Sequence, residues 1–231
     1  MSGGVLDATY AHDRLQKPEV RFRYRIRARI VVEAVRRYLG RAEQVRVLDL
    51  GSAEGRALQE LHAMLPNSTF CGVERSAELI AEAPSLPKSI QLYCGDVTAL
   101  PGELEGPFDV VSALAVLEHL SAPQGAVREG AKVLRSGGSF GAAGPSPPWD
   151  HVAARLGAAH DDAHEVELDR GAMIALAEDA GLEVERVVKK RFATRLKKAT
   201  VKKRFPSGAA QTRQQRSPSG SCCRAWATPF G

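Results

Sequence analysis

The chain has 231 residues, of which 44% are hydrophobic, 26% charged and 6% aromatic, and its formal net charge is +5. This length and composition suit one globular domain with tails, and they exclude a wholly disordered chain or a disulfide-rich miniprotein. No apolar run reaches the roughly 18 residues of a membrane span, and residues 1–13 lack the pattern of a secretory signal. We therefore expect a cytoplasmic protein without a transmembrane segment.

The charge is distributed unevenly along the chain. Residues 1–40 hold nine Lys or Arg against four Asp or Glu, and residues 194–231 hold nine against none, so the segment between them is acidic. A basic pI that comes from the two ends alone is a weak argument for nucleic-acid binding. The four cysteines show no spacing that is typical of a disulfide framework or a zinc site.

The N-terminal basic segment, residues 1–40, predicts a helix. Arginines alternate with apolar residues over 21–30, which alone would suit a strand, but Phe22, Ile26 and Ile30 recur every four residues. The apolar stripe continues to Gly40, so we predict a helix over about residues 18–39. Its arginines either stay solvated while the helix packs on a sheet, or attract an anionic substrate, a lipid surface or a phosphate.

Apolar strands alternate with helical segments through residues 41–193. We predict strands at 45–50, 68–74, 89–96, 107–117, 139–144 and 182–192, and helices at 57–65, 77–83, 121–134 and 169–180, with Ser121 and Asp169 as helix caps. This order predicts an α/β fold with a doubly wound, mostly parallel sheet. Right-handed crossovers bring the carboxyl ends of such strands to one edge of the sheet, where ligands bind.

Beyond residue 193 the periodicity disappears. Residues 194–231 are rich in Ser, Pro, Gly, Arg and Gln, and we predict a basic disordered tail there. The organisation is therefore an N-terminal basic helical segment at 1–40, one α/β domain at 41–193, and a tail at 194–231.

The turn GSAEG at residues 51–55 carries the strongest chemical signal. It joins an apolar strand to a helix, where Gly51 allows a close backbone approach and free amides attract negative groups. A dinucleotide-binding fingerprint would need glycine at 51, 53 and 56, but the chain has Ala53 and Arg56. Asp49, just before the turn, disfavours a pyrophosphate and suits a cofactor that carries positive charge.

Four segments in order resemble the class I S-adenosylmethionine-dependent methyltransferase family, in its small-molecule branch. They are VLDLGSAEGRAL, CGVE, CGDVTALP, and FDVVSALAVLEHL followed by VLRSGGSF, and the resemblance covers about residues 40–192. It implies a Rossmann-like methyltransferase fold and S-adenosyl-L-methionine as cofactor. It also implies transfer of a methyl group to a small-molecule acceptor, which we expect to occur at oxygen.

The resemblance also implies which residues bind the cofactor. Glu74 stands in the place of the ribose-binding acid, Asp96 in that of the residue that contacts the adenine amine, and the turn faces the methionine end. Ala53 stands where the family has glycine, so either the turn uses a conformation that alanine tolerates or cofactor affinity is reduced. The implied set is Asp49, Gly51, Ser52, Ala53, Gly55, Glu74, Asp96, Val97 and Ala113.

His119, just after the fourth predicted strand, is the candidate catalytic base because histidine titrates near neutral pH. Its alternative role is to pack and hydrogen-bond beside the pocket. Glu118-His119 also resembles part of the metal-binding motif of some methyltransferases, but Ala115 stands where those carry a further acid, so we predict no metal. The loop at 144–168 could line the acceptor pocket, with Trp149, Asp150, His151, His160, Asp161, Asp162 and His164.

The C-terminal part departs from the family. The family's sheet normally ends with a seventh strand inserted antiparallel between the fifth and sixth, and only residues 196–205 offer a candidate, in which basic residues make a buried strand doubtful. We expect a divergent or incomplete end, from truncation or a change of reading frame, with an open sheet edge that lowers stability or favours a homodimer.

Two other functions stay open from the sequence. One is RNA methylation with the basic ends holding phosphates, although the chain lacks aromatic interleaving and a recognisable RNA-binding motif. The other is a non-catalytic relative that keeps the fold and binds the cofactor, which Ala53 and the unusual C-terminal segment motivate. A small-molecule acceptor is the partner that we expect, ahead of nucleic acid.

Overall fold

The computed structural model describes residues 18–40, 44–144, 166 and 168–187, with the backbone alone for 18–21 and for two short strands at 199–202 and 224–227. Within this part of the chain eight strands form one sheet in the order β3-β2-β1-β4-β5-β8-β6-β7. All neighbouring pairs from β3 to β6 are parallel, and β7 is antiparallel at one edge. The strands are β1 (Arg46–Leu50), β2 (Thr69–Glu74), β3 (Ile90–Cys94), β4 (Phe108–Leu114), β5 (Leu134–Ala143), β6 (Val184–Val187), β7 (Ala199–Lys202) and β8 (Arg224–Ala227).

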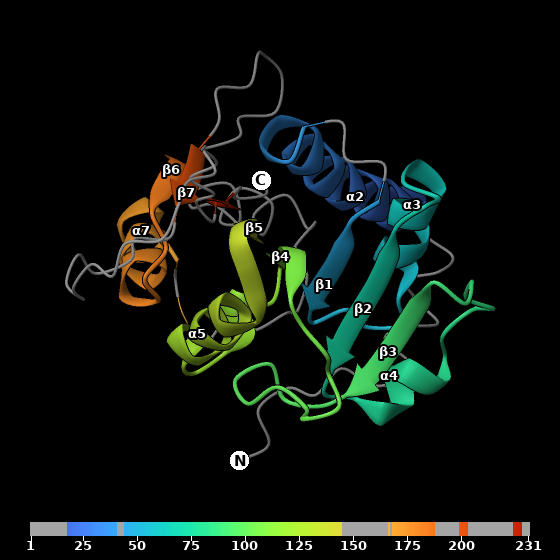
Figure 1. Cartoon of the computed structure of the whole chain (residues 1–231). Helices are drawn as coiled ribbons and strands as arrows, with labels where there is room; N and C mark the ends of the chain where they lie inside the picture. The colour runs from blue at the N-terminus through green and yellow to red at the C-terminus, as the bar shows by residue number, and fades with distance from the viewer. Residues whose placement is uncertain are drawn as a thin grey trace, which may run out of the picture.

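Helices cover both faces of this sheet, which confirms the predicted doubly wound α/β fold (Figure 1). Two of them, α2 and α3, pack on one face, while α5 and α7 pack on the other, because alternate residues of each strand point to opposite faces. The helical elements are α2 (Pro18–Tyr38), α3 (Arg56–Met64), α4 (Ala77–Ala81), the short 3₁₀ helix η1 (Leu117–His119), α5 (Pro123–Val133) and α7 (Arg170–Asp179). No helix among the described residues is long and apolar enough to cross a membrane.

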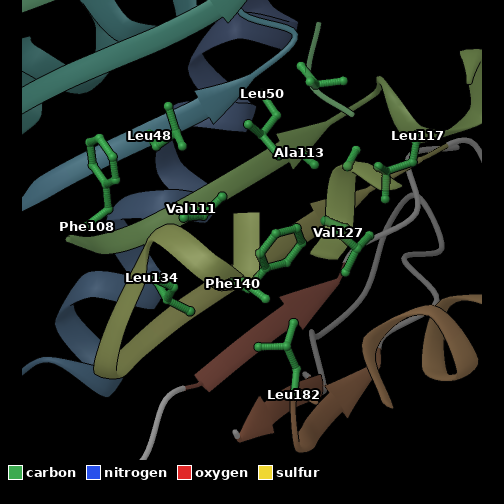
Figure 2. Packing of buried hydrophobic residues seen from close by; sticks show 14 of the residues in the cluster. Leu48, Leu50, Phe108, Val111, Ala113, Leu117, Val127, Leu134, Phe140 and Leu182 are labelled. Atoms are coloured by element: carbon green, nitrogen blue, oxygen red, sulfur yellow. The ribbon is translucent and has the colours of Figure 1, made fainter. Parts of the chain in front are cut away.

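The larger apolar cluster lies between the sheet and helices α5 and α7. Figure 2 shows the ring of Phe140 from β5 within this cluster, near Val111 of β4 and Val127 of α5. Phe140 and Val127 are almost completely buried, and Val111 is fully so. Gly130 of α5 permits this close packing, since a Cβ there would lie 2.6 Å from the Phe140 ring. The helix–sheet contact therefore holds β4 and β5, whose carboxyl ends enter the site, in fixed register.

The predicted N-terminal helix is confirmed as α2. Its face of Ala28, Val31, Val32 and Val35 is at most 5% exposed and packs against the second apolar cluster with α3 and the sheet. The segment forms a helix rather than a strand because a helix buries its apolar residues as one continuous stripe. The exposed residues of α2 are mostly arginines.

Two local predictions on the way from β4 to β5 are wrong. Ser121 is not the cap of α5: Ala122 occupies the cap position without a side-chain hydrogen bond, and Pro123 is the first helical residue. Strand β5 begins at Leu134 rather than at residue 139, because the SGG segment stays within the strand at a shift of register against β4. The other predicted cap is confirmed, since the Asp169 carboxylate accepts a hydrogen bond from the Ala172 amide.

The C-terminal region also differs from expectation. Strand β8 lies between β5 and β6 and is parallel to both, and β7 lies at the sheet edge, antiparallel to β6 and β8. The prediction of disorder is therefore wrong for residues 199–202 and 224–227, and the gap that we expected between the fifth and sixth strands is filled. Strands β5 and β6 both present backbone N–H and C=O groups that need hydrogen-bond partners, so even the short strand β8 is stabilised between them. The rest of 194–231 lies outside the described residues.

Candidate functional site

The carboxyl ends of β1, β2 and β4 meet at one edge of the sheet. Leu50, the last residue of β1, is in register with Val73 of β2 on one side and with Ala113 of β4 on the other. The chain then turns, and the amides of Gly51 and Ser52 both donate hydrogen bonds to the carbonyl of Val73, at 2.9 and 3.1 Å. The turn that the sequence singled out is therefore tied directly to the end of the neighbouring strand.

The backbone of this turn is left-handed at three places, Gly51, Ala53 and Gly55. Gly51 has φ +73°, and a Cβ there would lie 2.5 Å from Cγ2 of Val116, so any larger residue would clash with Val116. Ala53 has φ +47°, a conformation that costs alanine about 1–2 kcal/mol. Of the two alternatives that the sequence left for Ala53, the structure shows an alanine held in the left-handed region. Its amide is satisfied by a 3.0 Å hydrogen bond to Oε2 of Glu74.

Glu74 is the residue that joins the turn to β2. While Oε2 accepts the hydrogen bond from Ala53, Oε1 accepts one from the Ser76 amide at 3.0 Å. The carboxylate therefore stands in one orientation at the end of β2, half-buried beside the turn. Each oxygen keeps a second acceptor position, because a carboxylate offers about four in all. The predicted ribose-binding acid is thus placed next to the predicted methionine-binding turn.

Asp49 is a buried acid within β1, only 5% exposed. The Ser112 hydroxyl on β4 donates a 2.6 Å hydrogen bond to its Oδ1. Burial raises the pKa of Asp49 to about 7, the hydrogen bond from Ser112 and the charge of Arg27 oppose the rise, and the charge of Glu74 adds to it. This carboxyl therefore releases its proton only near neutral pH, well above the ordinary range of an aspartate.

Asp96 and Val97 lie just after β3, on the far side of β2 from the turn. The Gly95 amide donates to the Glu74 carbonyl at 2.9 Å, which brings the ends of β2 and β3 together. Oδ1 of Asp96 accepts two 2.7 Å hydrogen bonds, from the hydroxyl and the amide of Thr98, and these hold the pKa of Asp96 below its ordinary value. Asp96 is exposed and ionised, while Val97 is buried beneath it.

The remaining predicted cofactor residues line the same edge. Ser52 is buried against Gly72, and its hydroxyl has no hydrogen-bond partner among the described residues. Gly55 is the N-cap residue of α3, and Ala113, fully buried, is in register with Leu50 across the β1–β4 pair. The structure thus brings all nine predicted residues to the ends of β1, β2, β3 and β4.

His119 ends the short helix η1, which follows β4. Its amide donates to the Val116 carbonyl, and Val116 is the residue that packs on Gly51. The preceding Glu118 is 2% exposed, and a Cβ on Gly144 at the end of β5 would lie 3.4 Å from its Oε2. The segment 115–119 therefore spans the edge from the turn after β1 to the end of β5, on the side away from Asp96.

The predicted acceptor loop lies outside the described residues except for its ends. The part that is not described contains all seven residues named for the acceptor pocket: Trp149, Asp150, His151, His160, Asp161, Asp162 and His164. Among the residues that are described, no three His, Cys, Asp or Glu side chains gather as a metal site requires.

Sequence reasoning missed three polar residues that shape the site. Ser112 gave a signal, because it is the one hydroxyl within the apolar run of β4, and Thr98 follows Asp96 at the spacing of a side-chain-capped turn. Tyr24 gave none: its hydroxyl donates a 2.7 Å hydrogen bond to Oε1 of Glu54, 30 residues later, and so ties the start of α2 to the turn. Glu54 also faces the Arg56 guanidinium at 3.5 Å.

A family model and a curated relative match this region. Residues 48–142 match the model described as a methyltransferase domain. An uncharacterized 37.1 kDa protein in transposon TN4556 of Streptomyces fradiae is 33% identical over 110 residues, which are 46% of this chain and 31% of that protein. The chain thus spans about a third of the length of this relative.

Solved structures share the fold. The YcgJ protein from Bacillus subtilis superposes with a TM-score of 0.54 at 22% identity, over 69% of each chain. The plantazolicin methyltransferase BpumL, solved in complex with SAH, gives a TM-score of 0.59 at 14% identity, over 78% of this chain and 75% of that one. The sheet order agrees with the fold of these structures, and residues 48–142, which include the turn after β1, match a methyltransferase domain.

Proposed function

We propose that this protein transfers a methyl group from S-adenosyl-L-methionine to an oxygen atom of a small-molecule acceptor. The observation that carries the proposal is the Glu74 carboxylate, fixed on the amide of the left-handed Ala53, on the strand next to the buried carboxyl of Asp49. Two acids at the ends of adjacent strands favour a ligand with a cationic ammonium and sulfonium. Of the two, Asp49 lies beside the turn and disfavours the pyrophosphate of a dinucleotide there.

The residues at this edge fit each part of the cofactor. The free acceptor positions of Glu74 suit the two ribose hydroxyls, and Asp96, ionised and exposed, suits the adenine amine. Asp49 suits the ammonium at the methionine end. The absence of a side chain on Gly51 lets Val116 pack closely on the turn, which brings the segment that carries His119 next to it. The buried Ser52 hydroxyl offers one more polar group beside the turn.

When bound, the cofactor supplies a methyl group on a sulfonium, which is an excellent leaving group. The protein's own task is to align the acceptor with that methyl, to exclude water and to take up the proton of a hydroxyl acceptor. His119 is the base that we propose for the last of these, because it ends the segment that runs from Val116, at the turn, toward the end of β5.

Calorimetry with S-adenosylmethionine and with NAD tests the cofactor. We expect the first to bind and the second to give no measurable heat. Glu74→Gln should weaken S-adenosylmethionine binding by about 1–3 kcal/mol, because it loses a charged acceptor for the ribose. The matched control is Glu78→Gln, an exposed acid of α4 four residues away, which should bind like wild type. Tight binding of NAD alone, or equal affinity in both variants, would contradict the proposal.

A labelling experiment tests transfer and the acceptor atom. The protein is incubated with methyl-labelled cofactor and a cell extract, and the labelled product is identified by mass spectrometry. A methylated small molecule supports the proposal, and a methyl ether or ester confirms the oxygen. Cofactor binding without any labelled product would instead favour a non-catalytic relative.

A further inference from the structure

One exposed face of α2 carries arginines that no acid neutralises within the described part of the chain. Arg29, Arg36 and Arg37 lie outside the buried stripe, and all three are exposed. Ion pairs are found elsewhere in that part, including one between Arg25 and Glu60 at 3.3 Å, but none involves these three arginines. Within residues 22–38 of α2, Glu33 is the only acid.

A fourth arginine, Arg186 of β6, reaches the same place. Its guanidinium donates a hydrogen bond to the hydroxyl of Tyr38, while the Arg37 guanidinium lies 5.7 Å from the centre of the Tyr38 ring. Partial burial and the charge of Arg37 lower the pKa of Arg186 from its ordinary value, so the two cations repel each other. Glu185, the neighbouring residue of β6, is exposed. Arg37 of α2 and Arg186 of β6 therefore meet at Tyr38, and Arg29 and Arg36 extend this positive charge along the exposed face of α2 within the described residues.

The chemistry of this surface favours phosphate groups. The guanidinium is a planar fork that binds phosphate oxygens in pairs, and all four cations are arginines. Arg29 and Arg36 are seven residues apart, which is about 10 Å along a helix that rises 1.5 Å per residue. Phosphates follow one another about every 3.4 Å along the axis of a nucleic-acid strand, so this face spans about three of them.

The same helix argues against a membrane surface as the partner. Helices that lie in a bilayer interface bury their apolar face in lipid, but the apolar face of α2 is already buried in the core. Phe22 is the only large hydrophobic residue that is exposed among the described residues. The free face can therefore bind a partner through charge alone, as a phosphate backbone requires.

We propose that the arginine face, defined by Arg29, Arg36 and Arg37 of α2 with Arg186 of β6, binds the phosphate backbone of a nucleic acid. None of these residues belongs to the predicted cofactor set, so the proposal is independent of methyl transfer.

The test measures binding of the full chain to a fluorescent single-stranded RNA and to a duplex DNA at several salt concentrations. Each lost phosphate contact lowers the slope of log K against log salt by about 0.7–0.9. The variant Arg29→Gln/Arg36→Gln should therefore lower the magnitude of that slope by about 1.5 and raise Kd several-fold at low salt. The matched control is Lys88→Gln/Arg170→Gln, which removes two exposed charges elsewhere and should keep the wild-type slope.

Both variants are first checked for wild-type affinity for S-adenosylmethionine, which shows that the fold is intact. Arg186→Gln should also weaken nucleic-acid binding, because it is the member of the face that comes from β6. Preference for RNA or for DNA identifies the source of the phosphates. An equal loss in the control variant would show general charge attraction and overturn the proposal. So would a loss of binding to phosphatidylserine vesicles with nucleic-acid binding unchanged.

Discussion

Replacing Asp49 by asparagine should stabilise the cofactor-free protein at neutral pH and weaken its binding of the cofactor. Burial raises the pKa of Asp49 from 3.8 to about 7, against the hydrogen bond from Ser112 and the charge of Arg27. A pKa difference of about 3 between the folded and unfolded states corresponds to about 4 kcal/mol, at 1.36 kcal/mol for each tenfold change. This is the upper bound on what ionised Asp49 costs the folded state above pH 7.

The sign of the pH dependence follows from proton uptake. Between pH 4 and 7 the folded protein holds the Asp49 proton and the unfolded chain releases it, so this group makes stability fall as pH rises through that window. Above pH 7 both states are ionised and its contribution is constant. An asparagine at this position carries no charge and still accepts the hydrogen bond from Ser112, so the variant should lose this part of the pH dependence.

Urea denaturation at pH 5 and pH 8 measures the effect. We expect the variant to exceed wild type in free energy of unfolding at pH 8, by up to about 4 kcal/mol, and by less than half of that at pH 5, where only the first part of the loss has occurred. Glu82→Gln, an exposed acid of the C-terminal cap of α4, is the control and should change neither value. A variant that is less stable than wild type at pH 8 would refute the argument.

The same residue links cofactor binding to protons. An ammonium beside Asp49 favours the ionised carboxylate, so binding near pH 6 should release a proton. Calorimetry in buffers of different ionisation enthalpy reports that proton directly. The release should disappear in Asp49→Asn, together with a loss of about 1–3 kcal/mol in affinity. Proton release that persists in the variant would assign it to another group.

Three further predictions follow from the turn after β1 and from η1. Gly51→Ala should destabilise the protein by about 2–4 kcal/mol in urea denaturation, because it adds left-handed strain and a clash with Val116. Adding Val116→Ala should restore part of the lost stability. If it restores none, the backbone strain alone causes the loss. Ala53→Gly should raise the free energy of unfolding by about 0.5–1 kcal/mol, because glycine has no penalty at φ +47°. The control Ala63→Gly, at an exposed position within α3, should lower the free energy of unfolding. A change in the same direction for both variants would contradict the argument. If His119 is the base, His119→Ala should lower kcat by about 10²–10⁴ with cofactor affinity unchanged, and turnover within a few-fold of wild type would remove that role.

The fold of residues 45–144 could be predicted from the sequence because its signals are local. Apolar runs such as the one that ends at Leu50 make strands, and Gly or Pro residues and caps such as Asp169 delimit the helices. Once strands and helices alternate, right-handed crossovers bring the carboxyl ends of the parallel strands together. The nine predicted cofactor residues therefore meet at one edge, although Glu74 and Asp96 are far from the turn in sequence.

Local signals failed where long-range pairing decides the structure. The α5 cap at Ala122 and the early start of β5 depend on how the sheet holds the SGG segment, which no short window reveals. Strand β8 has weak strand propensity by itself and exists because β5 and β6 both offer it backbone partners. A four-residue strand is stabilised by its neighbours rather than by its own residues.

The sequence by itself determined the order of the elements and which acids stand at strand ends, because both depend on residue type and spacing. The tertiary structure alone decided the protonation state of those acids. Asp49 has a pKa near 7 because the folded sheet removes it from water, while Asp96 stays ionised because Thr98 and solvent remain beside it. It also decided that Arg25 of α2 pairs with Glu60, since charge compensation depends on neighbours that folding brings from distant parts of the chain.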